Sequence, residues 1–157
     1  MEKNIEAEAQ DCLFCRIIKG EIPSYKIYED KYCFAFLDIA GDYEGHTLVV
    51  PKKHTDNILT ANYETLTACS CVCQKIARHY VQNCGYEGVN ILTNANECAE
   101  QSVMHLHYHI IPRKNKDNLK IYPTRKNQGY DLEKLCEKLK MADVEDKLQL
   151  KVEKWSG

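Results

Sequence analysis

Apolar and polar side chains alternate along residues 103–112, a period of two that is typical of a β-strand. Side chains two positions apart share one face of a strand, so His105, His107 and His109 are expected on one side of it. Other short apolar runs lie between turn-forming residues and predict further strands. The expected strands cover residues 26–29, 33–38, 46–51, 89–94 and 103–112.

A helical period between these strands predicts one long helix over residues 63–84. Its apolar positions recur at spacings of three and four and form one stripe: Leu66, Cys69, Cys73, Ile76, Tyr80 and Cys84. The close cysteines of this helix could be read as a metal cluster, but Cys71 falls on another face, so core packing is the favoured interpretation. A short helix is also expected over residues 14–19.

Several strands that follow one another along the chain, interrupted by a single long helix, predict an α+β fold with a sheet layer. We expect one domain over residues 11–113, preceded by a flexible N-terminus over 1–10. Residues 114–157 are more polar and are expected to form a connector and a C-terminal helical extension. A helix over 131–140 would begin at Asp131, a good N-cap. This helix would pack on the domain or on a partner subunit, or else belong to a solvated tail.

Composition and charge narrow the class of protein. The chain has 157 residues, 44% of them apolar, and a formal net charge of −2, which suits one compact domain with its own core. We find no basic stripe, so nucleic-acid binding is disfavoured, and no apolar run long enough to cross a bilayer. The nine cysteines are an odd number and no apolar leader precedes Asp11. We therefore expect a reducing compartment, the cytoplasm with the nucleus as a second location, rather than disulfide bonds.

The histidine row is the clearest candidate for chemistry. Residues four apart on a strand lie ~13 Å apart, at a rise of ~3.3 Å per residue. The outer two imidazoles therefore cannot reach one ion through metal–nitrogen bonds of ~2.0 to 2.1 Å. A single histidine on a half-buried strand is often merely solvated. Three in register are better explained by a function on that face.

The seven residues from His105 to Ile111 read HLHYHII. This stretch resembles the signature of the histidine triad (HIT) family of nucleotidyl hydrolases and transferases, in which three histidines alternate with apolar residues. The resemblance extends upstream through residues 11–18, 34–39 and 45–54, in the family's order. It implies a HIT-like antiparallel sheet with one long helix and a short N-terminal helix. It also implies a homodimer that forms through the long helix and an adjacent strand.

The resemblance implies a covalent mechanism in which the middle histidine, His107, attacks the α-phosphorus of a nucleotide. Water then hydrolyses the nucleotidyl-histidine. Neutral imidazole suits this role because it carries a free lone pair near neutral pH. By the same resemblance, His46 and a backbone carbonyl of the triad region orient this arrangement, and His109 donates a hydrogen bond to the phosphoryl oxygens. The positions that match the family's contacts to the phosphate or the leaving group are Asn94, Gln101 and Ser102.

Two neighbouring positions leave alternatives open. Asn94 taken alone is nearly as well explained by a loop turn. The family usually has glycine before the Gln-Ser pair, where the backbone comes close to an anion, and this chain has Glu100. A carboxylate beside a phosphate would repel it. Either Glu100 turns outward or the leaving-group side of the site differs.

The nucleoside pocket is also inferred from the resemblance. Asp38 matches the acid that accepts both ribose hydroxyls, and a carboxylate between two apolar residues needs a donor to offset its burial. The apolar positions that match the residues enclosing the base are Leu13, Phe14, Ile17, Phe36 and Ile39. Each of these would also serve as ordinary core.

A Cys-x-x-Cys pair, Cys12 and Cys15, stands near the start of the domain and by itself could be a redox or a metal motif. In one branch of the family such a pair binds a tetrahedral zinc with two histidines, here His54 and the first histidine of the triad, His105. Two thiolates and two imidazoles leave no open position, which describes a structural zinc. It would pin the N-terminal segment onto the strand that carries His107. The alternative is two buried free thiols.

The leading hypothesis from these resemblances is a zinc-containing, Hint-like HIT hydrolase. Its substrate would be a purine nucleotide, from which it releases AMP or GMP by cleaving a phosphoramidate or a related leaving group. One alternative is a dinucleoside polyphosphate hydrolase that uses the same chemistry. Another is a nucleotide-binding adaptor with little turnover, which works through partner proteins.

Overall fold

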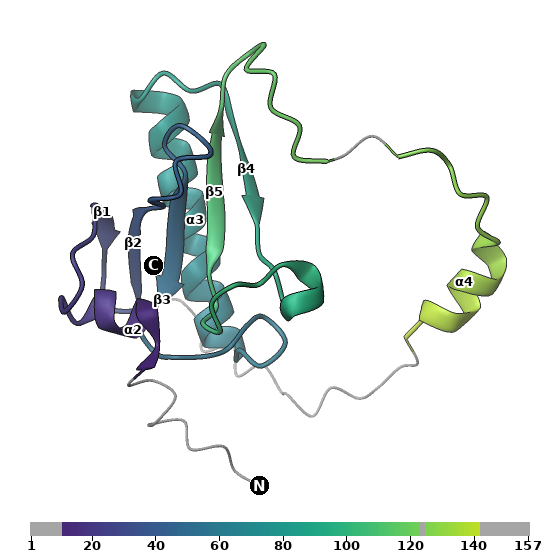
Figure 1. The fold of residues 1–157 in the computed structure, drawn as a ribbon, viewed down its shortest axis with the longest axis horizontal. Helices are drawn as coiled ribbons and strands as arrows, with labels where there is room; N and C mark the ends of the chain where they lie inside the picture. The colour runs from purple at the N-terminus through teal and green to yellow at the C-terminus, as the bar shows by residue number, and fades with distance from the viewer. Residues whose placement is uncertain (1–10, 123–124, 142–157) are drawn as a thin grey trace, which may run out of the picture. The chain divides into compact units, whose positions relative to one another are not determined.

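A five-stranded antiparallel sheet forms the centre of the fold, in the strand order β1-β2-β3-β5-β4 (Figure 1). The computed structural model describes residues 11–122 and 125–141, so the flexible segment expected over 1–10 lies outside the described residues. The strands are β1 (Lys26–Glu29), β2 (Cys33–Leu37), β3 (Thr47–Pro51), β4 (Gly88–Leu92) and β5 (Tyr108–Arg113). The α+β class expected from the sequence is confirmed.

The helices are α2 (Leu13–Ile18), α3 (Tyr63–Asn83), the single 3₁₀ turn η1 (Glu97–Ala99) and α4 (Leu132–Leu139). α3 begins after Asn62, whose side chain accepts a hydrogen bond from the Thr65 amide over 2.9 Å. Cys71 lies exposed on another face, as expected, and Cys84 is also exposed, so the apolar stripe ends earlier than predicted. The buried residues of α3 are Cys69, Val72, Cys73, Ile76 and Tyr80.

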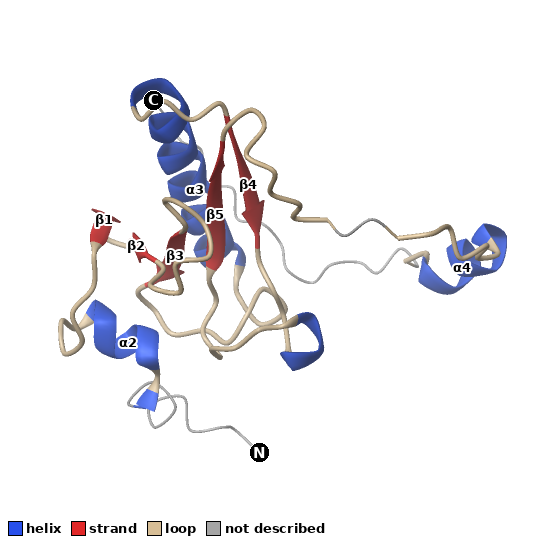
Figure 2. Cartoon of the chain, turned by 45° about the horizontal axis from the view of Figure 1, so that its top comes forward, coloured by secondary structure: helices blue, strands red, loops and turns tan. Residues whose placement is uncertain are grey.

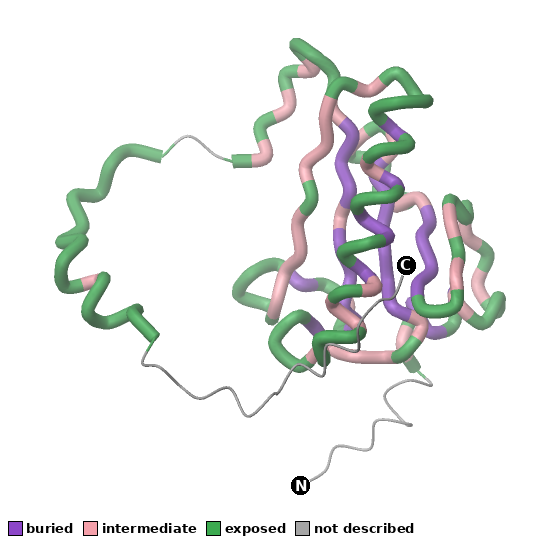
Figure 3. Tube along the Cα trace, turned by 180° about the vertical axis from the view of Figure 1, so that it is seen from behind, coloured by how far each residue is buried: buried purple, intermediate pink, exposed green. Residues whose placement is uncertain are grey.

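The sheet is covered by α2 on one face and by α3 on the other (Figure 2). Side chains alternate between these faces along β2: Phe34 and Phe36 pack under α2, whereas Cys33 and Ala35 pack under α3. Cys33 Sγ lies 3.7 Å from Cys69 Sγ, and both thiols fill the core. β2 and β3 are thus buried on both faces, as Figure 3 shows from behind.

The last strand is shorter than the alternation predicted. β5 begins at Tyr108, so His105 and His107 precede it and only His109 lies within it. The expectation of one strand over residues 103–112 is therefore wrong in its first half.

The reason lies in the hydrogen bonds of the segment before β5. The Leu106 amide donates to the Thr55 carbonyl over 2.7 Å, and the His105 amide donates to the Val103 carbonyl over 2.8 Å. Backbone groups that would have joined a ladder are thus occupied by a loop contact and a tight turn. Leu106 is nevertheless fully buried in the core under α3, on the face that the alternation assigned to it.

The chain divides into two compact units, Met1–Ile121 and Tyr122–Gly157, and α4 belongs to the second. Asp131 caps α4 as predicted, because its carboxylate accepts a hydrogen bond from the Lys134 amide over 3.1 Å. Residues 142–157 of the expected extension lie outside the described residues. Within the described part of the chain, none of the helices combines the length and the apolar character that a bilayer crossing needs.

Gly45 turns the chain into β3 with a φ of +72°, and a Cβ there would lie 3.0 Å from the Tyr86 hydroxyl oxygen and 3.2 Å from Pro112 Cγ. We expect Gly45→Ala to lower the free energy of unfolding by about 2 kcal/mol or more. Left-handed backbone costs a residue with a Cβ ~1–2 kcal/mol, and the two close contacts add strain. Chemical denaturation would measure this loss.

Gly41→Ala is the matched control, because Gly41 has a φ of +74° but nothing within 4 Å of an added Cβ. Its loss should be limited to the backbone term of ~1–2 kcal/mol. Equal losses for the two variants would show that the contacts around Gly45 have no energetic effect.

Candidate functional site

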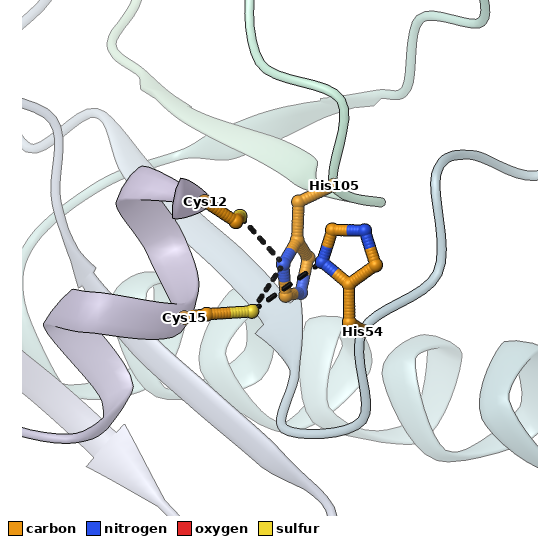
Figure 4. A group of neighbouring side chains, drawn as sticks. All are labelled: Cys12, Cys15, His54 and His105. Atoms are coloured by element: carbon orange, nitrogen blue, oxygen red, sulfur yellow. Dashed lines mark hydrogen bonds between the residues drawn. The ribbon is translucent and has the colours of Figure 1, made fainter. Parts of the chain in front are cut away.

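Four side chains from three separate segments converge beside α2 (Figure 4). Cys12 Sγ lies 3.4 Å from His105 Nδ1, and Cys15 Sγ lies 3.3 Å from His54 Nδ1 and 3.5 Å from His105 Nδ1. One ligand atom of each residue lies within 4.8 Å of the others. These are the four residues that the resemblance implied as metal ligands, and the structure brings them together.

The spacing of these atoms fits a tetrahedral zinc ion. Zinc–sulfur bonds of ~2.3 Å and zinc–nitrogen bonds of ~2.0 to 2.1 Å at tetrahedral angles place sulfur and nitrogen ligands about 3.5 Å apart. The second nitrogen of each imidazole faces an oxygen. His105 Nε2 lies 2.9 Å from the Pro51 carbonyl oxygen, and His54 Nε2 lies 3.4 Å from an Asp56 carboxylate oxygen. Such partners fix the ring so that Nδ1 points into the cluster.

The pKa values of His105 and Cys15 are also compatible with a bound cation. Burial lowers the pKa of His105 to about 4, which keeps its imidazole neutral, as a metal ligand must be. Burial and the neighbouring Cys12 raise the pKa of the Cys15 thiol to about 12. A metal cation would stabilise the thiolate that this environment otherwise disfavours.

His107 lies beside this cluster, and one hydrogen bond fixes which of its nitrogens is free. Its Nδ1 lies 2.7 Å from the His105 carbonyl oxygen, and because a carbonyl only accepts, Nδ1 carries the proton. The lone pair of the neutral ring is therefore on Nε2. Burial lowers the pKa of His107, so the ring is neutral near pH 7.

Two contacts that sequence reasoning missed hold His107 in place. The Thr93 hydroxyl donates to the His107 carbonyl over 2.8 Å. Phe14 of α2 meets the ring edge-on, with ring centroids 5.3 Å apart, and meets His105 in the same way at 5.9 Å. The sequence predicts Phe14 in the base pocket or in the core, and neither expectation includes its contact with the histidine rings.

His46 pairs with the third histidine of the triad. Its Nε2 lies 2.9 Å from His109 Nδ1, and its Nδ1 lies 3.5 Å from an Asp38 carboxylate oxygen. The orienting contact of His46 is therefore made to His109, whereas the His107 ring is oriented by the backbone. The His109 and His107 rings lie side by side, with centroids 4.9 Å apart. Burial and the nearby His107 lower the pKa of His109 to about 4.

Gln101 is 3% exposed, and its side chain joins three loop segments. Nε2 donates to the Asp56 and Val103 carbonyls over 2.7 and 2.9 Å. Oε1 accepts from the Asn96 amide and from the Asn57 side chain over 2.9 and 3.3 Å. The Gln101 amide donates to the Asn96 carbonyl over 3.2 Å. Its donors are thus used within the protein, and its expected contact with a ligand stays a prediction.

The remaining expected residues lie in different environments. Ser102 is exposed and lines a cavity of about 780 Å³ together with Leu13, His54 and other residues beside the metal cluster. Asn94 is half-buried beyond the end of β4. Of the apolar residues expected around the base, three are buried in the core and two are exposed. The buried ones are Phe14, Ile17 and Phe36, and the exposed ones are Leu13 at 44% and Ile39 at 86%.

Comparison with known proteins identifies the family. The family model of the HIT domain matches residues 19–116. A relative from Bacillus subtilis, protein hit, is 46% identical over 108 residues, which cover 69% of this chain and 74% of that protein. This chain belongs to the HIT family.

Other HIT-family members are similar over most of this chain. The adenosine 5′-monophosphoramidase of Saccharomyces cerevisiae is 39% identical over 105 residues, covering 67% of this chain and 64% of that protein. A zinc-bound histidine triad family protein from Mycobacterium smegmatis has a solved structure that is 37% identical, with a TM-score of 0.69, and the match covers 75% of this chain and 86% of that one. The chain is a hydrolase of the HIT family.

Glu100, which departs from the HIT pattern, closes η1 in the left-handed conformation, with φ 66° and ψ 26°. Glycine adopts this conformation without steric cost, which explains physically why glycine suits this position. Glu100 is exposed, in agreement with the alternative in which it turns outward.

We expect Glu100→Gly to raise the free energy of unfolding by up to about 1.5 kcal/mol. Relief of the left-handed conformation is worth ~1–2 kcal/mol, of which the added freedom of the unfolded chain removes ~0.5–1 kcal/mol. The midpoint of urea unfolding would measure the gain.

Glu97→Gly is the matched control within η1, because Glu97 is not among the non-glycine residues with positive φ. It should lower the stability, since only the unfolded chain gains freedom. A Glu100→Gly protein that is less stable than the native one would contradict the strain argument.

Proposed function

We propose that this protein hydrolyses nucleoside 5′-phosphoramidates and releases AMP or GMP through a covalent nucleotidyl-His107 intermediate. The observation that carries the proposal is the hydrogen bond from His107 Nδ1 to the His105 carbonyl, which leaves a lone pair on Nε2 of a neutral ring. The name of the yeast relative, an adenosine 5′-monophosphoramidase, supports the substrate class.

The reaction proceeds in two displacements at one phosphorus. In the first, His107 Nε2 attacks the α-phosphorus and forms an N–P bond. The P–N bond to the leaving amine breaks, and the amine keeps the electron pair and takes up a proton from solvent. In the second, water attacks the same phosphorus and loses a proton, and the bond to His107 breaks. The nucleoside monophosphate is released and the neutral imidazole is restored.

Groups around His107 would stabilise the charge that develops on the phosphoryl oxygens. The His109 ring lies beside it, with centroids 4.9 Å apart, and can donate from Nε2 to a phosphoryl oxygen once the ring has taken up a proton. Ser102 is exposed and lines a cavity together with Leu13 and His54, and its hydroxyl would donate to a phosphoryl oxygen or to the leaving group.

The nucleoside would lie against the exposed apolar side chains near α2 and β2. Leu13 and Ile39 are 44% and 86% exposed, so both can contact a purine ring. Asp38 would accept the ribose hydroxyls. One of its oxygens already accepts the Ala40 amide over 2.9 Å, which orients the carboxylate and leaves further lone pairs available.

Two observations rank phosphoramidates above dinucleoside polyphosphates. The Cys-x-x-Cys pair, Cys12 and Cys15, resembles the branch of the family to which phosphoramidases belong. The yeast relative is named an adenosine 5′-monophosphoramidase.

We also propose that Cys12, Cys15, His54 and His105 bind a structural zinc ion. The atom spacing described above and the zinc-bound relative support this assignment. Four protein ligands leave no open position, so the ion would hold the start of α2 against the His105 segment and would not activate water.

We expect His107→Ala to reduce AMP release from adenosine 5′-phosphoramidate by about 10³-fold or more, because the nucleophile is lost. The native protein, quenched during turnover, should carry one adenylyl group by mass spectrometry, and the variant none. Steady-state kinetics at matched circular dichroism would measure the loss.

His79→Ala, at an exposed histidine of α3, is the control and should keep native turnover. Undiminished release by the His107→Ala protein would exclude the covalent mechanism. Tight AMP binding without turnover in the native protein would instead support the adaptor hypothesis.

We expect the purified protein to contain zinc, measured by plasma mass spectrometry, and the variants Cys15→Ser and His54→Asn to lose most of it. Loss of the ion should also lower the melting temperature, since the metal stabilises only the folded chain.

Cys71→Ser changes an exposed cysteine of α3 and should retain the metal. Unchanged zinc content in the two ligand variants would show that the metal is bound elsewhere.

A further inference from the structure

Asp38, His46 and His109 form a connected row at one end of the sheet. Asp38 follows β2, His46 immediately precedes β3, and His109 lies in β5, opposite Leu48 of β3. The Asp38 amide donates to the His46 carbonyl over 2.8 Å, which fixes the two segments to each other. The row therefore rests on the backbone of adjacent strands.

The middle member of this row has one nitrogen that needs a partner. His46 is 7% exposed, and its Nδ1 is buried without a hydrogen bond within the described part of the chain. An Asp38 carboxylate oxygen lies 3.5 Å from that Nδ1. Catalytic hydrogen bonds are often long in ligand-free structures and shorten in the complex. A small movement of Asp38 would complete this one.

The carboxylate decides where the protons of both imidazoles lie. An ionised carboxylate only accepts, so His46 presents Nδ1–H to Asp38 and keeps its lone pair on Nε2. That nitrogen lies 2.9 Å from His109 Nδ1, which must then be the donor. The lone pair of neutral His109 is consequently on its Nε2. Without Asp38, the other tautomer pair would be equally allowed, in which His46 Nε2 carries the proton and donates it to His109 Nδ1.

We propose that Asp38, acting through His46, positions His109 as the proton acceptor for the hydrolytic water. This inference rests on the proposed function and adds a role to Asp38 beyond its expected contact with ribose. His109 Nε2 takes a proton from water as the water oxygen forms its bond to phosphorus. The N–P bond to His107 breaks and its electron pair returns to that ring. The Asp38 charge stabilises the resulting His109 imidazolium, which then releases the proton to solvent.

The first test reads the tautomers directly and needs no turnover. In two-bond ¹H–¹⁵N spectra of the native protein, His46 and His109 should both be protonated at Nδ1. Asp38→Ala should remove this preference in His46, whereas Asp38→Glu, which keeps a carboxylate that only accepts, should restore it. Asp42→Asn removes a nearby exposed charge and should leave the spectra unchanged. An Nε2–H tautomer of native His46, or no effect of Asp38→Ala, would overturn the proposal.

The second test separates positioning from ribose binding by comparing adenosine 5′-phosphoramidate with its 2′,3′-dideoxy analogue. If Asp38 positions His109, Asp38→Ala lowers kcat by ~10- to 100-fold on both substrates. If it serves only the ribose, the variant loses nothing on the dideoxy substrate relative to the native protein, and the proposal is wrong. If the native protein showed no turnover, the result would count against the proposed function only. The spectra would still show whether Asp38 sets the tautomers of His46 and His109.

Discussion

The buried amide of Gln101 is the constraint on which the candidate site depends. It binds the loop after β3 through the Asp56 carbonyl and Asn57, and it also binds Asn96 and Val103 on either side of itself in sequence. A buried amide that lost one of these partners would leave an unpaired polar group in the interior. The chain before β5 is therefore held in one irregular path, and that path decides where the first two histidines of the triad point.

α2 joins two functions within a single short helix. Cys12 and Cys15 belong to the cluster with His54 and His105, while Phe14 contacts the rings of both His105 and His107. The same Phe14 packs with Phe36 in the core on this face of the sheet. Movement of this helix would disturb the cluster and the proposed nucleophile together, so a zinc ion bound as proposed would affect the proposed reaction without taking part in it.

Most elements could be predicted from the sequence because their signals are local. The apolar run of β2, the helical period of α3 and the cap at Asp131 each depend on residues close in sequence, and each of these elements is present in the structure. The strand expected over 103–112 failed for the opposite reason. Its first half matches a strand by period, but its amides are taken by Thr55 and Val103, and no local pattern shows those partners.

The sequence alone proposed the set of side chains at the candidate site, because its resemblance to the HIT motifs marks the histidines, the cysteine pair and the acidic position without coordinates. Only the tertiary structure decided how they are connected. His46 pairs with His109, and Asp38 stands next to His46 as well as beside the expected ribose position. The His46–His109 pair joins residues 63 positions apart. Such contacts follow from strand register and the depth of burial, which a one-dimensional pattern does not contain.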